Sequence, residues 1–468
     1  MDTHSTSTSR LRILLILTDL IGLASAYSLA YALRLSGFDP HLLTSGLALI
    51  FAALNFLSLY LFDLYEFDPQ VPRSRKALQT LGAVFIAGCV IVLFAFLTGA
   101  VEFSGLIGRG VLIGAQTLFA LWAALVRLGL AYWFRASSAR ARFLVLGTDD
   151  NIKAFAKDLS ASGFPGTFSL LTQGVPPGTP SIASVAAHTP QRLQIEGSWQ
   201  DFERLAAQDW SAIIVCAGNN LPEELVEVLM TIRLRGVRVV DLTDFYEDLW
   251  SKVPVFYLQR SWFAMAQGFR LLHNPVGLRL KRLFDLLGAI FLLVITSPLL
   301  ALFSIAVKIE SRGPALFRQV RVGESGKTFM VYKLRSMRQD AEKEGAQWAK
   351  VKDSRVTKVG SFIRATRIDE LPQLVNVLRG EMSFIGPRPE RPEFMDRLEA
   401  EIPFYNLRHI LKPGVTGWAQ VMYPYGASVE DAKEKLQYEL YYIKNYSLLL
   451  DATIVLKTVR VVLFGRGR

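Results

Sequence analysis

The order of apolar and polar residues divides the chain into a membrane-like first part and a mixed second part. Four segments are apolar over about the ~20 residues that a bilayer-spanning helix needs, namely Ile13–Ala32, Ser45–Phe62, Leu81–Ala100 and Val111–Ala131. Arginine and lysine gather before the first segment, between the second and third, and after the fourth. Because positive residues favour cytoplasmic loops, we predict a four-helix transmembrane domain over residues 1–135 with both of its ends in the cytoplasm.

The periodicity changes after residue 141. Apolar runs at Phe143–Gly147, Ala212–Ala217 and Val237–Val240 are typical of buried strands, and Pro222–Arg235 has the pattern of an amphipathic helix with proline at its start. Strands that alternate with helices predict a Rossmann-like α/β domain over residues 142–254. Its first turn carries Asp149 where a dinucleotide-binding loop has its second glycine. A regulatory or assembly role therefore fits better, and a nucleotide pocket stays as the alternative.

One further apolar segment, residues 286–307, contains no charge, and hydropathy alone indicates a fifth span. Its flanks are basic on both sides, and Ser297-Pro298 falls near its middle. Proline removes a backbone hydrogen bond and bends a helix. We therefore expect a re-entrant helix that bends at Pro298 and leaves the membrane on the cytoplasmic side, with a kinked span as the alternative.

Two adjacent carboxylates, Asp369 and Glu370, stand at the start of a predicted helix. Apolar residues recur at helical spacing after them, Asp369 occupies the expected N-cap position, and Gly380 closes the pattern. A capping residue next to one that complements the helix dipole is the ordinary interpretation. Arginines that include Arg364, Arg367 and Arg388 crowd the same stretch. This mixture of charges favours a phosphate-bearing substrate held together with a divalent ion.

Two cations alternate on a predicted strand near residues 329–337. Lys333 and Arg335 share one face at a period of two, where they can meet a diphosphate or a membrane surface. A solvated strand face explains the same spacing equally well. Near the end of the chain, residues 448–464 mix apolar residues with charges in the way expected of a helix that lies in the membrane interface.

Composition supports an interaction with membranes and anions. The chain of 468 residues is 51% hydrophobic and carries a formal net charge of +11, which suits lipid headgroups and phosphates. Nucleic acid is the least expected of the anionic partners, because the sequence has neither zinc-finger spacing nor a basic helix free of the apolar segments. With only two cysteines, Cys89 and Cys216, neither a disulfide framework nor a cysteine metal site is expected.

Several long motifs together resemble one known family. From about Leu280 to Phe464 the chain is similar to the bacterial sugar transferases, the monotopic polyprenyl-phosphate phosphoglycosyl transferases, and its whole layout resembles their large form. The matching stretches, in chain order, are KRLFDLLGAI, the Ser297-Pro298 break, GPALFRQVRVGESGKTFMVYKLRSM, RIDELPQLVNVLRGEMSFIGPRPE and KPGVTGWAQV. The resemblance implies a mixed α/β catalytic domain over residues 275–468 that rests on the re-entrant helix.

The resemblance also implies an activity. Members transfer a hexose-1-phosphate from a UDP-hexose to undecaprenyl phosphate, release UMP and so initiate surface polysaccharide synthesis, in the exopolysaccharide, O-antigen or capsule class. By this resemblance Asp369 is the nucleophile that forms a phosphosugar intermediate, Glu370 is associated with Mg²⁺ and with the active-site geometry, and Arg388 of the Pro-Arg-Pro motif contacts the nucleotide sugar. Asp369 and Glu370 are then the expected metal ligands.

Rival functions predict other motifs. A membrane-anchored dehydratase or epimerase needs a GxGxxG turn and a Tyr-x-x-x-Lys pair, and a metal-dependent glycosyltransferase is expected to show Asp-x-Asp; the sequence has none of these in the required places. A non-catalytic membrane scaffold for polysaccharide assembly remains the alternative. We expect the protein in a bacterial inner membrane with its catalytic domain on the cytoplasmic face, and the α/β domain and helix bundle are candidate homodimer surfaces.

Overall fold

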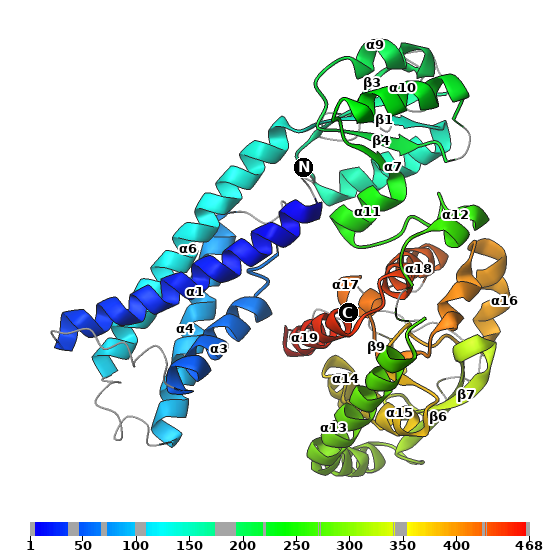
Figure 1. The fold of residues 1–468 in the computed structure, drawn as a ribbon. Coiled ribbons are helices and arrows are strands. Elements are labelled where there is room, and N and C mark those ends of the chain that lie inside the picture. The colour runs from blue at the N-terminus through cyan, green and yellow to red at the C-terminus, as the bar shows by residue number, and fades with distance from the viewer. Residues whose placement is uncertain are drawn as a thin grey trace. The chain divides into compact units, whose positions relative to one another are not determined.

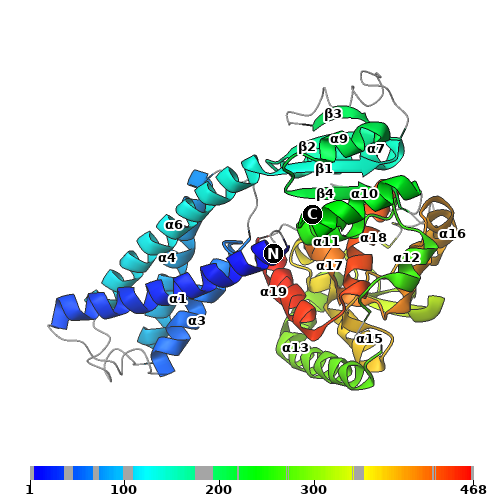
Figure 2. The same cartoon turned by 45° about the horizontal axis from the view of Figure 1, so that its top comes forward.

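The computed structural model describes residues 5–35, 46–66, 73–98, 109–173, 193–218, 221–269, 271, 273–339, 341, 353–423, 426 and 428–464. The chain divides into two compact units, Met1–Asp248 and Leu249–Arg468 (Figures 1 and 2). The Pro/Ser/Gly-rich stretch 174–190, which the sequence predicts to be a surface loop, lies outside the described residues.

Four apolar helices open the first unit. They are α1 (Ser5–Leu35), α3 (Gly46–Leu61), α4 (Arg73–Leu97) and α6 (Arg109–Arg140). The segments Leu11–Arg34, Ser74–Leu97 and Gly110–Arg140 are long and apolar enough to cross a membrane. The described part of α3 has 16 residues and rises only ~24 Å, against a bilayer core of ~30 Å. It covers all but the two end residues of the segment predicted at Ser45–Phe62.

A buried ion pair links α1 to α6. Asp19 accepts two hydrogen bonds from Arg127, at 2.9 Å from Nη1 to Oδ1 and 2.8 Å from Nη2 to Oδ2, and both side chains are almost fully buried. The Arg127 guanidinium also lies 5.3 Å from the centre of the Tyr65 ring. For Asp19 the sequence leaves open a functional role, a hydrogen bond between helices or a place near the interface, and the structure shows a hydrogen bond between helices.

The rest of the first unit is a parallel sheet with helices. Its strands β1 (Arg142–Gly147), β2 (Thr167–Thr172), β3 (Leu193–Ser198), β4 (Ala212–Cys216) and β5 (Val239–Asp241) pair in the order β3-β2-β1-β4-β5. The helical segments are α7 (Asp149–Ser162), η1 (Trp199–Asp201), α9 (Phe202–Ala206), α10 (Glu223–Leu234) and α11 (Leu242–Trp250). The strands predicted at 143–147 and 212–217 and the helix at 222–235 match closely, the strand predicted at 237–240 begins two residues later, and β2 and β3 are additional.

The turn after β1 differs from a phosphate-binding loop. The first turn of α7 carries Asp149 and Asp150, and negative side chains there oppose an anion at the helix N-terminus. The Trp199 indole nitrogen donates a 3.1 Å hydrogen bond to the Gly147 carbonyl in the same turn. Both features separate this turn from the glycine-rich loop of ordinary dinucleotide-binding domains.

The second unit packs short elements around two small sheets. The antiparallel hairpin β6 (Leu316–Val322) and β7 (Thr328–Leu334) pairs Leu316 with Leu334, and β8 (Ser383–Ile385) pairs in parallel with β9 (Gly414–Thr416). The surrounding segments are α12 (Arg260–Met265), α13 (Pro275–Glu310), η2 (Glu324–Gly326), α14 (Lys358–Ala365), η3 (Ile368–Gln373), α15 (Leu374–Arg379), α16 (Pro392–Glu401), η4 (Tyr405–Ile410), α17 (Trp418–Met422), α18 (Val429–Lys444) and α19 (Leu448–Phe464).

The long apolar helix α13 is bent. Ala289 packs in one cluster with Val331 of β7, and Val307 packs in another with Leu334 of the same strand. In a straight helix Ala289 and Val307 would be ~27 Å apart, whereas Val331 and Leu334 are ~10 Å apart along a strand. The two arms of α13 therefore lie at an angle, as Figure 1 shows.

Pro298 lies between these two arms. Proline has no N–H to donate to the Val294 carbonyl, and the Ser297 hydroxyl donates a 2.8 Å hydrogen bond to that oxygen instead. The Ser-Pro pair thus permits the bend while keeping this carbonyl satisfied. The outward face of α13 is apolar and exposed, with Phe291 62%, Val294 67% and Ile309 81% accessible.

Candidate active site

The acidic pair lies inside a short 3₁₀ segment. The chain enters η3 through Arg367, which has a left-handed backbone with φ of 59°, and continues into α15 up to Gly380, with φ of 83°. The prediction that Asp369 is the N-cap is wrong, because the helical segment already begins at Ile368. The prediction that Gly380 ends the helix is confirmed.

Cations surround Glu370. Its Oε1 lies 2.6 Å from Arg388 Nη2, 3.5 Å from Lys333 Nζ and 3.8 Å from Arg367 Nη1, while the residue is only 7% exposed. Burial alone would raise the pKa of this carboxyl, but Arg388, Lys333 and Arg367 together hold the pKa well below its usual range. Glu370 is therefore a permanent anion that positions three cations.

Asp369 has the same exposure but a different environment. Its Oδ1 is buried and receives no hydrogen bond from any described residue. Burial and the charge of Glu370 raise the pKa of Asp369. Lys333, Arg367 and Arg364 act against both, and the net result is a pKa of about 6. The neighbouring carboxylates are thus unequal, since one is saturated with cations and the other has an oxygen available.

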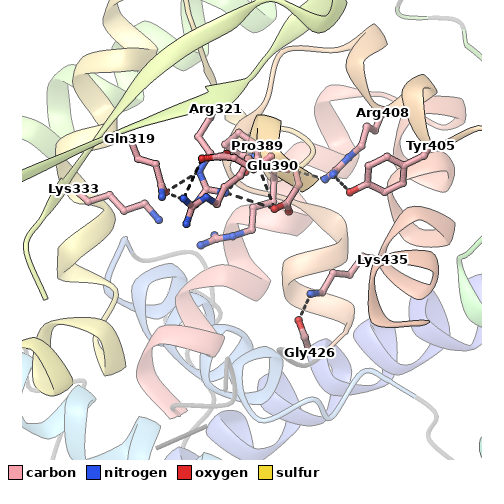
Figure 3. A network of polar contacts seen from close by, with 12 residues as sticks. Gln319, Arg321, Lys333, Pro389, Glu390, Tyr405, Arg408, Gly426 and Lys435 are labelled. Carbon is pink, nitrogen blue, oxygen red and sulfur yellow. Dashed lines mark hydrogen bonds and ion pairs between the residues drawn. The ribbon is translucent and has the colours of Figure 1, made fainter. Parts of the chain in front are cut away.

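Further cations extend the site along β6 and β7. The Arg321 guanidinium donates to the Pro389 carbonyl at 3.1 Å and to Gln319 Oε1 at 2.6 Å, and Lys333 lies beside this group in Figure 3. Burial lowers the pKa of Lys333 to about 8 and the pKa of Arg321 to about 10. Desolvated cations of this kind gain strongly from a bound anion.

A buried ion pair holds the Pro387-Arg388-Pro389 loop. Arg408 Nη2 donates to the Arg388 carbonyl and to Glu439 Oε1, both at 2.7 Å, and Glu439 Oε1 also accepts from the Arg388 backbone N–H at 3.3 Å. Arg408 and Glu439 are almost fully buried. The backbone beside the Arg388 side chain is therefore fixed, which orients its guanidinium toward Glu370.

The other predicted site residues lie in different places. The Arg335 guanidinium is buried at the end of α13, where it donates to the carbonyls of Ser311 at 2.7 Å and Arg312 at 2.9 Å. It does not join the cations around Glu370. Arg364, on α14, is half-buried and contributes to the electrostatics of Asp369. Ser297 and Pro298 form the bend of α13.

The chemistry of the acidic pair suits a magnesium ion that is shared with a substrate. Within the described ranges, no three His, Cys, Asp or Glu side chains gather as a complete protein cage. Mg²⁺ commonly binds through one or two carboxylates together with substrate phosphates and water. The unpartnered Oδ1 of Asp369 and the adjacent Glu370 carboxylate meet that requirement, so the predicted metal ligands fit the ion.

Sequence reasoning overlooked three residues of the site. Arg321 belongs to a motif quoted above. It follows Gln319 by two residues, and this strand-like spacing is the only sequence signal that would have predicted it as a site residue. Arg408 and Glu439 are 31 positions apart and meet only through the fold. A basic and an acidic residue on separate helical segments carry no spacing that predicts this pair.

Comparison with known proteins places the second unit in a family. The family model described as "Bacterial sugar transferase" matches residues 276–465. An Aeromonas hydrophila protein named UDP-N-acetylgalactosamine-undecaprenyl-phosphate N-acetylgalactosaminephosphotransferase is 41% identical over 274 residues, 58% of this chain and 64% of that protein. The chain thus spans less than two thirds of that relative.

Two other relatives match over shorter stretches. A Bacillus subtilis (strain 168) protein named putative undecaprenyl-phosphate N-acetylgalactosaminyl 1-phosphate transferase is 56% identical over 131 residues, 28% of this chain and 73% of that protein. An Escherichia coli (strain K12) protein named UDP-glucose:undecaprenyl-phosphate glucose-1-phosphate transferase is 42% identical over 188 residues, 40% of each chain.

Proposed function

The chain belongs to the bacterial sugar transferase family, and we propose that it transfers a hexose-1-phosphate from a UDP-hexose to undecaprenyl phosphate and releases UMP. The names of its relatives support both substrates. The product would be the first lipid-linked sugar of a surface polysaccharide. The observation that carries the proposal is the unequal environment of Asp369 and Glu370.

Asp369 is the nucleophile of this proposal. An Asp369 oxygen attacks the β-phosphorus of the UDP-hexose, the bond from that phosphorus to the bridging oxygen breaks, and UMP leaves with the bond's electrons. The hexose phosphate is then joined to Asp369 through an acyl phosphate bond. A phosphate oxygen of undecaprenyl phosphate attacks the same phosphorus, the acyl phosphate bond breaks, and the Asp369 carboxylate is restored. Two displacements thus replace one direct reaction between substrates.

The surrounding positive charges lower the energy barrier that arises from repulsion between Asp369 and the phosphates of the substrates. The desolvated cations Lys333 and Arg321, together with the partly exposed Arg388, supply a positive wall for the diphosphate. Preorganised charges of this kind stabilise a phosphoryl-transfer transition state. Glu370 holds Arg388 and Lys333 in place. Asp369 and Glu370 would hold Mg²⁺, which would supply positive charge to neutralise the transferred group.

The membrane arrangement follows from the acceptor. Its phosphate lies at the membrane surface while its prenyl tail stays in lipid, so the site must rest at that surface. The exposed apolar face of α13 and the bend at Pro298 support a re-entrant helix whose ends both lie in the cytoplasm. A label after Arg312 should then report the same side of the membrane as a label at Arg140. Opposite sides would show that α13 spans.

A direct assay tests the reaction. Purified protein, Mg²⁺, undecaprenyl phosphate and radiolabelled UDP-sugar should yield lipid-linked sugar and UMP, and without acceptor the intact protein should gain the mass of a hexose phosphate. Asp369→Asn should abolish both signals, whereas Arg397→Gln, which changes an exposed ion pair on α16, should leave both intact.

Normal turnover by Asp369→Asn would disprove the assignment of Asp369 as the nucleophile. Polysaccharide assembly that persists without turnover would favour the alternative of a non-catalytic membrane scaffold. A panel of UDP-glucose, UDP-galactose and UDP-N-acetylgalactosamine identifies the donor, because the relatives are named for different sugars.

A further inference from the structure

A buried amide, Asn376 of α15, joins the helical segment of the acidic pair to strand β7. Its side chain has no exposed surface. Nδ2 donates to the Met330 carbonyl at 2.6 Å, and Oδ1 accepts from the Tyr332 backbone N–H at 3.3 Å. Strand β6 pairs along one edge of β7 in their two-stranded sheet. On the other edge the Asn376 amide therefore does what the peptide group of a third strand would do.

Asn376 also binds the chain that follows α15. Its Nδ2 donates a second hydrogen bond, at 2.7 Å, to Glu381 Oε2. Its backbone carbonyl accepts from the N–H groups of Glu381 and Met382 at 3.1 and 3.3 Å. The backbone contacts hold the turn after α15, whereas the side-chain amide holds β7. A substitution of the side chain therefore separates the two roles.

The contact between Asn376 and β7 lies beside the ion pair of the site. Lys333 directly follows Tyr332 on β7, and Glu370 precedes Asn376 on the continuous run of η3 and α15. The Lys333 ammonium lies 3.5 Å from Glu370 Oε1, but an ammonium is a point charge on a flexible chain and sets little direction. An amide that both donates and accepts fixes the register of the strand it meets. Because a strand displaced by one residue turns its side chains to the opposite face, the amide decides which side chain of β7 faces Glu370.

We propose that Asn376 is a positioning residue of the transfer reaction, which holds β7 in the register that presents Lys333 to the diphosphate of the donor. The inference rests on the proposed function, in which Lys333 belongs to the positive wall around that diphosphate. Asn376 is completely buried, so it does not touch the substrate and acts through Lys333. A shift of β7 would carry the ammonium away from the phosphates and weaken donor binding.

Steady-state UMP release at saturating undecaprenyl phosphate tests this role with Asn376→Leu, which keeps the approximate size of the side chain and removes its hydrogen bonds to β7. We expect the KM for the UDP-hexose to rise about tenfold, about 1.4 kcal/mol. A loss of folded protein alone would lower the apparent kcat and leave the KM unchanged. Asn376→Asp keeps the shape but turns an oxygen toward the Met330 carbonyl, so it should raise the KM as well, and it provides the test if Asn376→Leu does not fold.

Glu381→Ala is the matched control, because it removes one hydrogen bond of the same amide and keeps both bonds to β7. It should leave the KM for the donor unchanged. A double-mutant cycle with Lys333→Ala shows which residue Asn376 acts through. In the Lys333→Ala protein, Asn376→Leu should change the KM by less than about twofold, because the effects of two residues that act as one unit do not add.

The outcomes separate this inference from the proposed function. An unchanged KM in both Asn376 variants would overturn the inference, and so would an equal rise in KM with and without Lys333. Either result with an active wild type leaves the proposed function intact. A wild type that releases no UMP from any UDP-sugar would refute the proposed function, and the role of Asn376 with it.

Discussion

Opposite stability effects are expected from the two neighbouring carboxylates. At pH 8 Asp369 is a buried anion whose pKa is raised from 3.8 to about 6, which costs the folded state up to about 3 kcal/mol at about 1.36 kcal/mol for each pH unit. Asp369→Asn removes the charge and keeps the shape. We therefore expect this inactive variant to be more stable than the wild type, by up to about 6–12 °C in the unfolding temperature of the second unit.

The raised pKa of Asp369 also predicts how the stability difference between the two proteins changes with pH. A raised pKa means that the folded protein binds more protons than the unfolded chain between about pH 4 and pH 6, so the wild type loses stability as the pH rises through this window. The advantage of Asp369→Asn should be complete at pH 8 and should shrink as the pH falls below about 6. Thermal unfolding of full-length protein in detergent, followed at several pH values, measures the difference.

Glu370→Gln is the matched control, because it makes the same change at equal exposure. It removes the anion that Arg388 and Lys333 share, and breaking a buried ion pair costs about 3–5 kcal/mol. Glu370→Gln should therefore lower the unfolding temperature. If both variants shift it in the same direction, or if the Asp369→Asn difference does not vary with pH, the inference that the carboxylates have different roles fails.

Three further predictions concern other parts of the chain. The kcat/KM for UMP release should fall as the pH drops through about 6, with about a tenth of Asp369 ionised at pH 5; a flat profile would contradict the nucleophile. Arg335→Ala should lower the free energy of unfolding by about 2–4 kcal/mol, because its charged hydrogen bonds at the end of α13 are lost. It should not change the KM for the donor, whereas Arg388→Ala should raise that KM. Steady-state kinetics on folded protein separates the two variants. Asp19→Asn should destabilise the apolar helices by about 3–5 kcal/mol, and adding Arg127→Gln should recover part of the loss in a double-mutant thermal unfolding cycle.

Uninterrupted apolar runs made parts of the fold predictable. Strands β1 and β4 are nearly continuous buried runs, and this pattern is legible without a structure. β2 contains Thr and Ser, and β3 at the sheet edge is partly exposed, so neither shows a clear strand period. The bend in α13 was predictable because proline acts locally. The N-cap was not, because a left-handed backbone at Arg367 has no sequence signal.

The site residues show the same limit. The resemblance identified Asp369, Glu370 and Arg388, but their unequal environments depend on Lys333, 37 positions from Glu370, and on a loop fixed by Arg408 and Glu439. The spacing of two residues predicted that Arg335 shares a strand face with Lys333. The strand ends at Leu334, and the end of α13 then takes the Arg335 guanidinium. Local spacing cannot predict which of two neighbouring cations a distant helix will bind.

Because α13 has one buried and one exposed apolar face, the stability of the second unit depends on the lipid or detergent around it. One face supplies Ala289 and Val307 to the core beneath the acidic pair, and the other leaves Phe291 and Val294 exposed. An amphiphile that binds this face more tightly than it binds the unfolded chain stabilises the protein by mass action. Lipid or detergent therefore acts as a thermodynamic ligand of the catalytic unit, and a measured stability has meaning only together with the amphiphile and its concentration.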